Sequence, residues 1–98
     1  MKKINEFSKV EFVEHIPEKL EYGVLYVSEK YKVTDHLCPC GCGREIPVPI
    51  KFQNEKNSEA WYYDKNTFEK ITLNPSLLNA LCPNKAHYFI RFNKIIWC

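Results

Sequence analysis

Apolar and polar side chains alternate along much of the chain, and this alternation predicts short β-strands. A period of two is expected for a strand that rests one face on a core, whereas amphipathic helices repeat every three to four residues. The predicted strands, alternating or not, are rich in β-branched and aromatic residues. They cover residues 9–14, 24–28, 31–37, 44–52, 60–63, 67–73, 88–92 and 95–97. We therefore expect a mostly β fold of seven to eight short antiparallel strands.

Prolines mark the ends and edges of these predicted strands. Pro17 follows the first strand, and proline has no N–H to donate to a ladder. Pro47 and Pro49 are two residues apart, so both missing donors fall on the same side of segment 44–52. This arrangement favours an edge strand or an extended arm over a central strand.

Polar connections predict the turns in the second half of the chain. Residues 64–66 and 93–94 are each flanked by predicted strands, so each is expected to close a hairpin. Residues 74–76, Asn-Pro-Ser, predict a turn, or the cap of one short helical turn over residues 77–81.

The length limits the chain to a single domain over residues 1–98. Residues 1–8 precede the first predicted strand and are expected to form a loosely ordered start. Hydrophobic residues make up 45% of the chain, which is typical of globular proteins. A domain this small buries a modest core, and a bound structural metal is one common way to stabilise it.

The charge pattern argues against nucleic acid as a partner. The formal net charge is +2, acidic and basic residues are interspersed, and the sequence contains no basic run. The many aromatic residues in the predicted strands are therefore interpreted as core and cross-strand pairs, and not as a platform on which bases stack.

Composition also favours a cytoplasmic protein without a membrane-spanning segment. No apolar run approaches membrane-spanning length, and the first residues lack the apolar region and cleavage site of a signal peptide. The chain has five cysteines, whereas a secreted disulfide scaffold usually has an even number. A reducing compartment and thiolate–metal bonds explain these cysteines better.

The cysteines gather in two clusters that predict one metal site. The stretch HLCPCGCG occupies residues 36–43, and the smaller cluster CPNKAH occupies residues 82–87. Cysteine and histidine are the usual ligands of zinc, so Zn²⁺ is the predicted cofactor. Six side chains are candidate ligands: His36, Cys38, Cys40, Cys42, Cys82 and His87.

A closed zinc site needs four ligands, so two of the six are excluded in a one-metal site. The preferred set is Cys38, Cys42, Cys82 and His87. In the main variant Cys40 replaces either Cys42 or His87. His36 is expected to lie beside the ligands and to neutralise thiolate charge. A two-metal cluster that uses all six side chains with bridging thiolates is the remaining alternative.

The order of several motifs resembles a small prokaryotic and phage domain family with an HLCPCGCG box and a closing C…HYWI strand. The matching features are residues 36–43, Trp61, ITLNPSL at 71–77, Cys82 and the closing segment 87–97. The resemblance implies a metal-binding β domain. Some similar proteins are encoded beside bacterial ubiquitin-like conjugation components, which implies a protein partner from such a system.

Three functions are compatible with these features. The preferred hypothesis is a non-enzymatic zinc-binding module that serves as an interaction or accessory protein in a ubiquitin-like modification system. The first alternative is an accessory enzyme in which Cys40 and His36 carry out thioester or acyl transfer. The second alternative is a zinc finger that binds nucleic acid. The preferred hypothesis assigns no catalytic residue.

Overall fold

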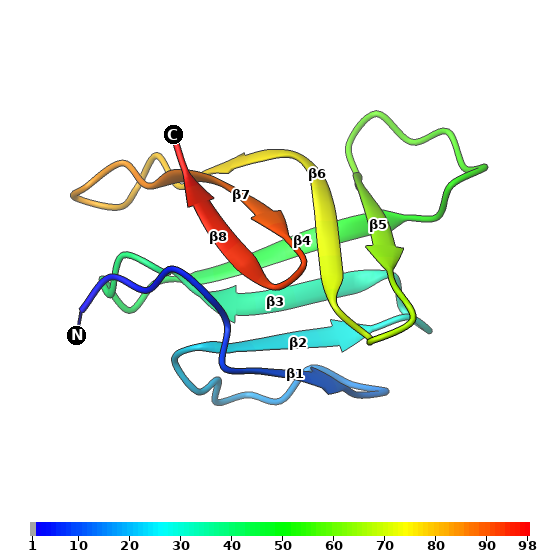
Figure 1. The fold of residues 1–98 in the computed structure, drawn as a ribbon, viewed down its shortest axis with the longest axis horizontal. Helices are drawn as coiled ribbons and strands as arrows, with labels where there is room; N and C mark the ends of the chain where they lie inside the picture. The colour runs from blue at the N-terminus through cyan, green and yellow to red at the C-terminus, as the bar shows by residue number, and fades with distance from the viewer. Residues whose placement is uncertain (1) are drawn as a thin grey trace.

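The computed structural model describes residues 2–98 and confirms the mostly β fold. Every regular element in this range is a strand (Figure 1). The strands are β1 (Lys9–Phe12), β2 (Val24–Ser28), β3 (Val33–Leu37), β4 (Glu45–Lys51), β5 (Trp61–Lys65), β6 (Ile71–Leu78), β7 (His87–Arg91) and β8 (Lys94–Trp97). Residues 2–98 contain no helix that is long and apolar enough to cross a membrane.

The eight strands pair in chain order, from β1 at one edge to β8 at the other. Two of the pairings differ from the predicted antiparallel arrangement, because β1 runs parallel to β2 and β4 runs parallel to β5. Long connections precede both parallel partners, and such connections leave room for a chain to return in the same direction. The remaining neighbours are antiparallel.

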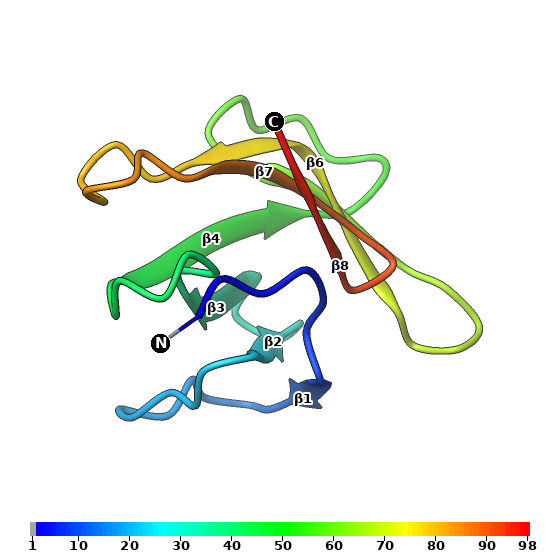
Figure 2. The same ribbon diagram turned by 60° about the vertical axis from the view of Figure 1, so that its left-hand side comes forward.

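Strand β4 divides the sheet into two halves that fold over a common core (Figure 2). It pairs with β3 over residues 45–49 and with β5 only at Ile50 and Lys51. The predicted edge strand is wrong, because β4 lies between β3 and β5 in the sheet. Pro47 and Pro49 are tolerated because they lie where β4 pairs with β3 alone. The core joins side chains of both halves, including Leu25, Val27, Val48, Ile71, Leu73, Tyr88 and Ile90.

The predicted turn at residues 74–76 is wrong, as is the helical turn over 77–81, because β6 continues to Leu78. The register between β6 and β7 shifts between Leu73 and Leu77, and Pro75 lies within this irregularity. Proline is tolerated at a bulge because the bulged residues do not donate to the ladder. Both predicted hairpins, β5–β6 and β7–β8, are present.

The start of the chain is held more firmly than the sequence suggests. Residue 1 of the predicted loose segment 1–8 lies outside the described residues. Within the rest, Ile4 donates its backbone N–H to Pro39 and Asn5 accepts one from Ile95. Phe7 is only 3% exposed and packs in the core. Residues 4–7 therefore cover the outer edge of β8, which protects an otherwise open strand edge.

Candidate functional site

The first cysteine cluster is a tight turn between β3 and β4. The backbone N–H of Cys38 bonds to the carbonyl of Arg44 at 2.8 Å, and that of Gly41 bonds to the carbonyl of Cys38 at 3.0 Å. Gly41 has a φ of 89°, in the left-handed region where a Cβ would cause strain. The turn needs this glycine because it reverses the chain within a few residues.

The second cluster is the connection from β6 to β7, residues 79–86. Its ends are joined by a 2.8 Å bond from the N–H of Asn79 to the carbonyl of Ala86. Inside the loop, Cys82 donates to the carbonyl of Asn79, and Lys85 donates to the carbonyl of Cys82. These bonds curl the loop around Cys82 and direct it toward the first cluster.

The four thiols of Cys38, Cys40, Cys42 and Cys82 come together in the structure. Their sulfur atoms all lie within 4.8 Å of one another, so they could hold a metal ion. The Sγ atoms of Cys40 and Cys82 are 2.9 Å apart, and those of Cys38 and Cys40 are 3.4 Å apart. This group equals the predicted ligand set with Cys40 in the place of His87.

Hydrogen-bond donors surround these sulfur atoms and suit them to the thiolate form. The N–H groups of Asn84 and Ala86 point to Cys82, and the N–H of Arg44 points to Cys42. The side chain of Asn79 is also buried, and its amide nitrogen has no hydrogen-bond partner within residues 2–98. Such donors are the usual outer partners of metal-bound thiolates. The residues present therefore fit a metal ion.

The pKa values of the thiols differ with their surroundings. Burial raises the pKa of Cys38 to about 12 and also raises that of Cys42. Hydrogen bonds from Cys40 and from backbone N–H groups lower the pKa of Cys82 to about 6. A thiol buried without a countercharge stays protonated, and a bound cation would stabilise its thiolate. A set of four sulfur donors favours a soft or borderline metal ion.

His36 is not part of the group of four thiols, and its side chain is fully buried. Its Nε2 is 2.7 Å from the hydroxyl of Tyr88, and its ring contacts Phe7 edge to face at 5.3 Å between centroids. Burial lowers the pKa of His36 to about 3, so the ring is neutral. His36 therefore packs as a neutral core residue, and Cys40 makes its contacts with Cys38 and Cys82 instead.

His87 also lies outside the thiol group, at the exposed start of β7. Its Nε2 is 2.9 Å from the Oγ of Ser76 on the neighbouring strand β6. A serine hydroxyl in contact with an imidazole is the arrangement in which histidine can remove the serine proton. The outer face of β6 and β7 thus carries a potential nucleophile and base.

The sequence pattern does not identify Ser76 as a functional residue. The serine lies in ITLNPSL without a recognisable nucleophile motif such as G-x-S-x-G. The position of His87 in the cluster that begins at Cys82 predicts a metal ligand and not a base. The sequence carries no local signal for the pair, because Ser76 falls in the predicted turn 74–76 and His87 precedes the predicted strand 88–92.

The family comparison bears on this pair. Residues 12–98 match the family described as "Bacterial ubiquitination-like system serine protease (BubE)". The chain belongs to the BubE family. This match confirms the resemblance to a family associated with ubiquitin-like conjugation and points to protein partners. No curated protein and no solved structure matches the chain.

Proposed function

We propose that this member of the BubE family is a serine protease in a bacterial ubiquitination-like system, with Ser76 as nucleophile and His87 as general base. The single observation that carries the proposal is the 2.9 Å contact between Ser76 Oγ and His87 Nε2. The substrate would be a peptide or isopeptide bond at the C-terminus of a ubiquitin-like protein. The family description supports this choice, since it names both the system and the reaction class.

The contact supports these roles for the two side chains. For Ser76 to donate its proton to Nε2, the neutral imidazole of His87 must carry its own proton on Nδ1. The side chain of His87 is exposed and that of Ser76 is half-buried, so a substrate can reach both. Antiparallel pairing of Leu78 with His87 and of Leu77 with Tyr88 fixes the two strands beside the pair.

The reaction then follows the general course of acyl transfer. Ser76 Oγ attacks the carbonyl carbon while its proton passes to Nε2 of His87. Collapse of the tetrahedral species breaks the C–N bond, and the proton moves from Nε2 to the departing amine. Water next attacks the serine ester and gives a proton to Nε2. Release of the acid returns that proton to Oγ.

The four thiols have a separate, structural role in this proposal. Cys38, Cys40, Cys42 and Cys82 would bind one Zn²⁺, since four sulfur donors complete a closed zinc site. When bound, the metal would tie the loop of residues 79–86 to the turn between β3 and β4. The proposal places the protein in a reducing cytoplasm, where thiols remain available to bind the metal.

The experiment compares wild type with Ser76→Ala and His87→Ala. The substrate is the ubiquitin-like protein of the same system with a short C-terminal extension, and mass spectrometry follows release of the extension. Each variant is expected to lose at least about 10³-fold in kcat/KM. A fluorophosphonate probe should label wild type at Ser76. His15→Ala is the matched control, because His15 is also exposed and lies elsewhere.

A non-enzymatic interaction module, in which zinc stabilises a surface for a protein partner, predicts the opposite result. In that case wild type would release no extension, and Ser76→Ala would serve the modification system as well as wild type does. Either result would refute the proposed protease activity. An accessory enzyme that uses Cys40 and His36 has less support, because these side chains contact Cys82 and Tyr88 respectively.

A further inference from the structure

We infer that the tips of the β5–β6 and β7–β8 hairpins form a docking surface for the folded body of the protein whose tail is cut. We call it the tip surface and define it by Asn66, Phe68, Lys70, Phe92 and Lys94. The partner it fits presents an apolar side chain flanked by carboxylates. The inference rests on the proposed protease function and concerns how that protease selects its substrate.

The tip surface is a hollow with aromatic and basic walls. The five residues line a depression of about 560 Å³. Phe68 is 81% exposed and Phe92 is 51% exposed, so two aromatic rings are available for contact. Exposed apolar groups of this size, gathered at one place and rimmed by polar groups, mark interaction sites.

The two tips are fixed against each other before any partner binds. Asn93 accepts the N–H of Ile71 on its side-chain oxygen at 2.7 Å and donates its own N–H to the Ile71 carbonyl at 3.0 Å. The N–H of Phe92 bonds to the hydroxyl of Thr72 at 3.1 Å. Asn66 holds the other tip, because its side chain accepts the N–H groups of Phe68 and Lys70. A prearranged surface loses little entropy when it binds.

Phe92 has a backbone conformation that its own side chain disfavours. Its φ is 50°, and that of Asn93 is 66°, so both residues of the turn are left-handed. Asparagine and glycine are the usual residues of such a two-residue hairpin turn, and a bulky aromatic residue there is strained. A strained residue at an exposed tip indicates that the Phe92 ring has a function other than stabilising the fold.

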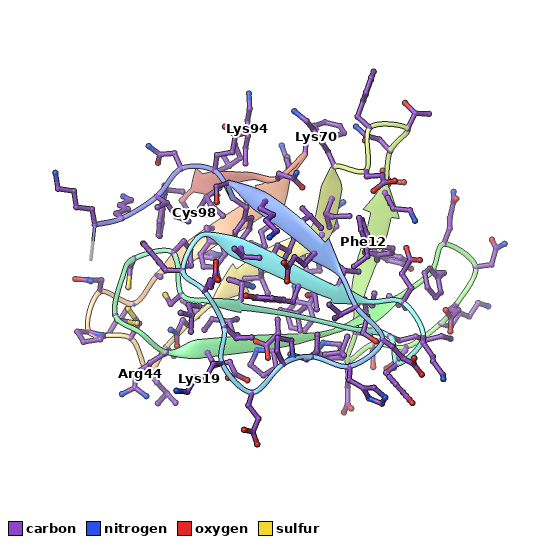
Figure 3. All side chains as sticks on the ribbon, turned by 90° about the horizontal axis from the view of Figure 1, so that it is seen from below. Phe12, Lys19, Arg44, Lys70, Lys94 and Cys98 are labelled. Carbon is purple, nitrogen blue, oxygen red and sulfur yellow. The ribbon has the colours of Figure 1, made fainter. Side chains whose placement is uncertain are left out.

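The charge of the tip surface selects the partner. Lys70 and Lys94 lie on the same face of the molecule (Figure 3), and no carboxylate is among the five lining residues. A second copy of this chain would bring lysine against lysine, which disfavours self-association through this surface. Carboxylates beside an apolar group complement both the lysines and the rings.

The tip surface and the serine–histidine pair lie at opposite ends of β7. Phe92 is five residues beyond His87, a distance of about 16 Å along an extended strand. The side chain of Phe89 shares the outer face with His87, and Ile96 opposite it is 42% exposed. A partner seated on the tip surface could therefore pass an extended tail along β7 to Ser76.

The test compares a protein substrate with a short one. The first is the ubiquitin-like protein of the same system with a C-terminal extension, and the second is a peptide with only its last residues and the same extension. Phe92→Asn is expected to raise KM for the protein at least about tenfold and to leave kcat/KM for the peptide unchanged. Lys70→Glu with Lys94→Glu should act in the same direction.

Phe92→Asn separates docking from folding, because asparagine tolerates a positive φ and the turn should be at least as stable. Tyr31→Ser is the matched control, since Tyr31 is 52% exposed on another turn. Equal KM values for the protein substrate with wild type and Phe92→Asn would overturn the inference.

A binding measurement keeps this result distinct from failure of the protease. Titration calorimetry with Ser76→Ala and the ubiquitin-like protein reports docking whether or not a bond is cut. Binding that is weakened at least about tenfold by Phe92→Asn supports the tip surface even if wild type cleaves neither substrate. Undiminished binding, or no binding to the Ser76→Ala protein, overturns it.

Discussion

Ser76 lies in a part of β6 that β5 does not reach. The ladder between these strands ends where Tyr62 pairs with Asn74, so the carbonyl of Ser76 has no β5 residue opposite it. The indole N–H of Trp61 occupies this place and donates to the Ser76 carbonyl at 3.2 Å. At the residue scale, Trp61 is therefore a positioning residue, because it fixes the backbone that carries the proposed nucleophile.

Trp61→Phe is expected to keep the ring packing and to lose this hydrogen bond. One such bond contributes about 1 kcal/mol, so kcat on the short peptide substrate should fall several-fold while KM changes little. Because β6 keeps its other pairs, thermal unfolding should shift by only a few degrees. Steady-state kinetics and calorimetry measure both quantities.

Tyr62→Phe is the matched control, because it changes the adjacent residue and removes an exposed hydroxyl. It should leave kcat at the wild-type value. A kcat of Trp61→Phe equal to that of wild type would show that the bond does not position Ser76.

Strands β3 and β4 hold two carboxyl groups that compete for protons. Asp35 is 3% exposed, and Glu45 lies two pairs further along the same ladder. Burial raises the pKa of Asp35 to about 7, and the hydrogen bond and charge of Glu45 act in the same direction. Strands β3 and β4 therefore pack best when Asp35 is protonated.

This raised pKa predicts a pH dependence of stability. The folded state binds the Asp35 proton more tightly than the unfolded chain, whose carboxyl has a pKa near 3.9. The stabilisation is complete below that value and is lost as pH rises through about 7. Asp35→Asn keeps an oxygen for the N–H of His36 and removes the ionisable group. A rise of about three pKa units corresponds to about 4 kcal/mol, so Asp35→Asn should exceed wild type in unfolding free energy by about 4 kcal/mol at pH 8 and by about 3 kcal/mol at pH 6.

Denaturant unfolding at the two pH values checks this difference. Asp64→Asn is the control, because Asp64 is exposed on β5 and should show the same pH dependence as wild type. A constant difference between Asp35→Asn and wild type across this range would contradict a raised pKa at Asp35.

Strands whose pattern reflects local burial could be predicted from the sequence. The β-branched and aromatic residues at 24–28 and the polar residues between predicted hairpin strands are local signals, and the structure has β2 and both hairpins there. The parallel pairing of β1 with β2 has no local signal, since it depends on how a connection returns. The turn predicted at residues 74–76 is wrong because a β-bulge tolerates proline as well as a turn does.

The candidate site could likewise be predicted only in part from the sequence. The dense spacing of residues 36–43 predicts a group of thiols, and the structure brings Cys38, Cys40 and Cys42 together with Cys82. Spacing alone could not choose between Cys40 and His87, because that choice depends on which face of β7 bears the imidazole. Alternation along β7 gives Tyr88 to the core and His87 to the outer face beside Ser76.

At the scale of the whole molecule, the thiol group lies between the two halves of the sheet. Three of its cysteines belong to the turn between β3 and β4, and Cys82 belongs to the loop between β6 and β7. That loop also joins the strand of Ser76 to the strand of His87. A metal ion held by the four thiols would thus fix both the arrangement of the halves and the approach of the proposed catalytic pair.

Removal of the metal is therefore expected to affect the fold and the catalytic pair together. Protein produced in the cytoplasm should carry one zinc per chain, measured by native mass spectrometry and elemental analysis. Chelation should lower Tm by more than about 15 °C, because structural zinc contributes several kcal/mol or more to folding. Hydrogen exchange should show loss of protection over residues 76–90, and the fluorophosphonate probe should no longer label Ser76.

Cys82→Ser and Cys98→Ser separate the metal from thiol chemistry in general. Cys98 is an exposed free thiol outside the group of four, so Cys98→Ser should keep its zinc, its Tm and its labelling. Cys82→Ser should lose all three, because it removes the ligand that the β6–β7 loop contributes. A Cys82→Ser protein that loses zinc yet keeps its labelling would show that the β6–β7 ladder alone holds Ser76 against His87. The metal would then stabilise the two halves of the sheet without any part in arranging the catalytic pair.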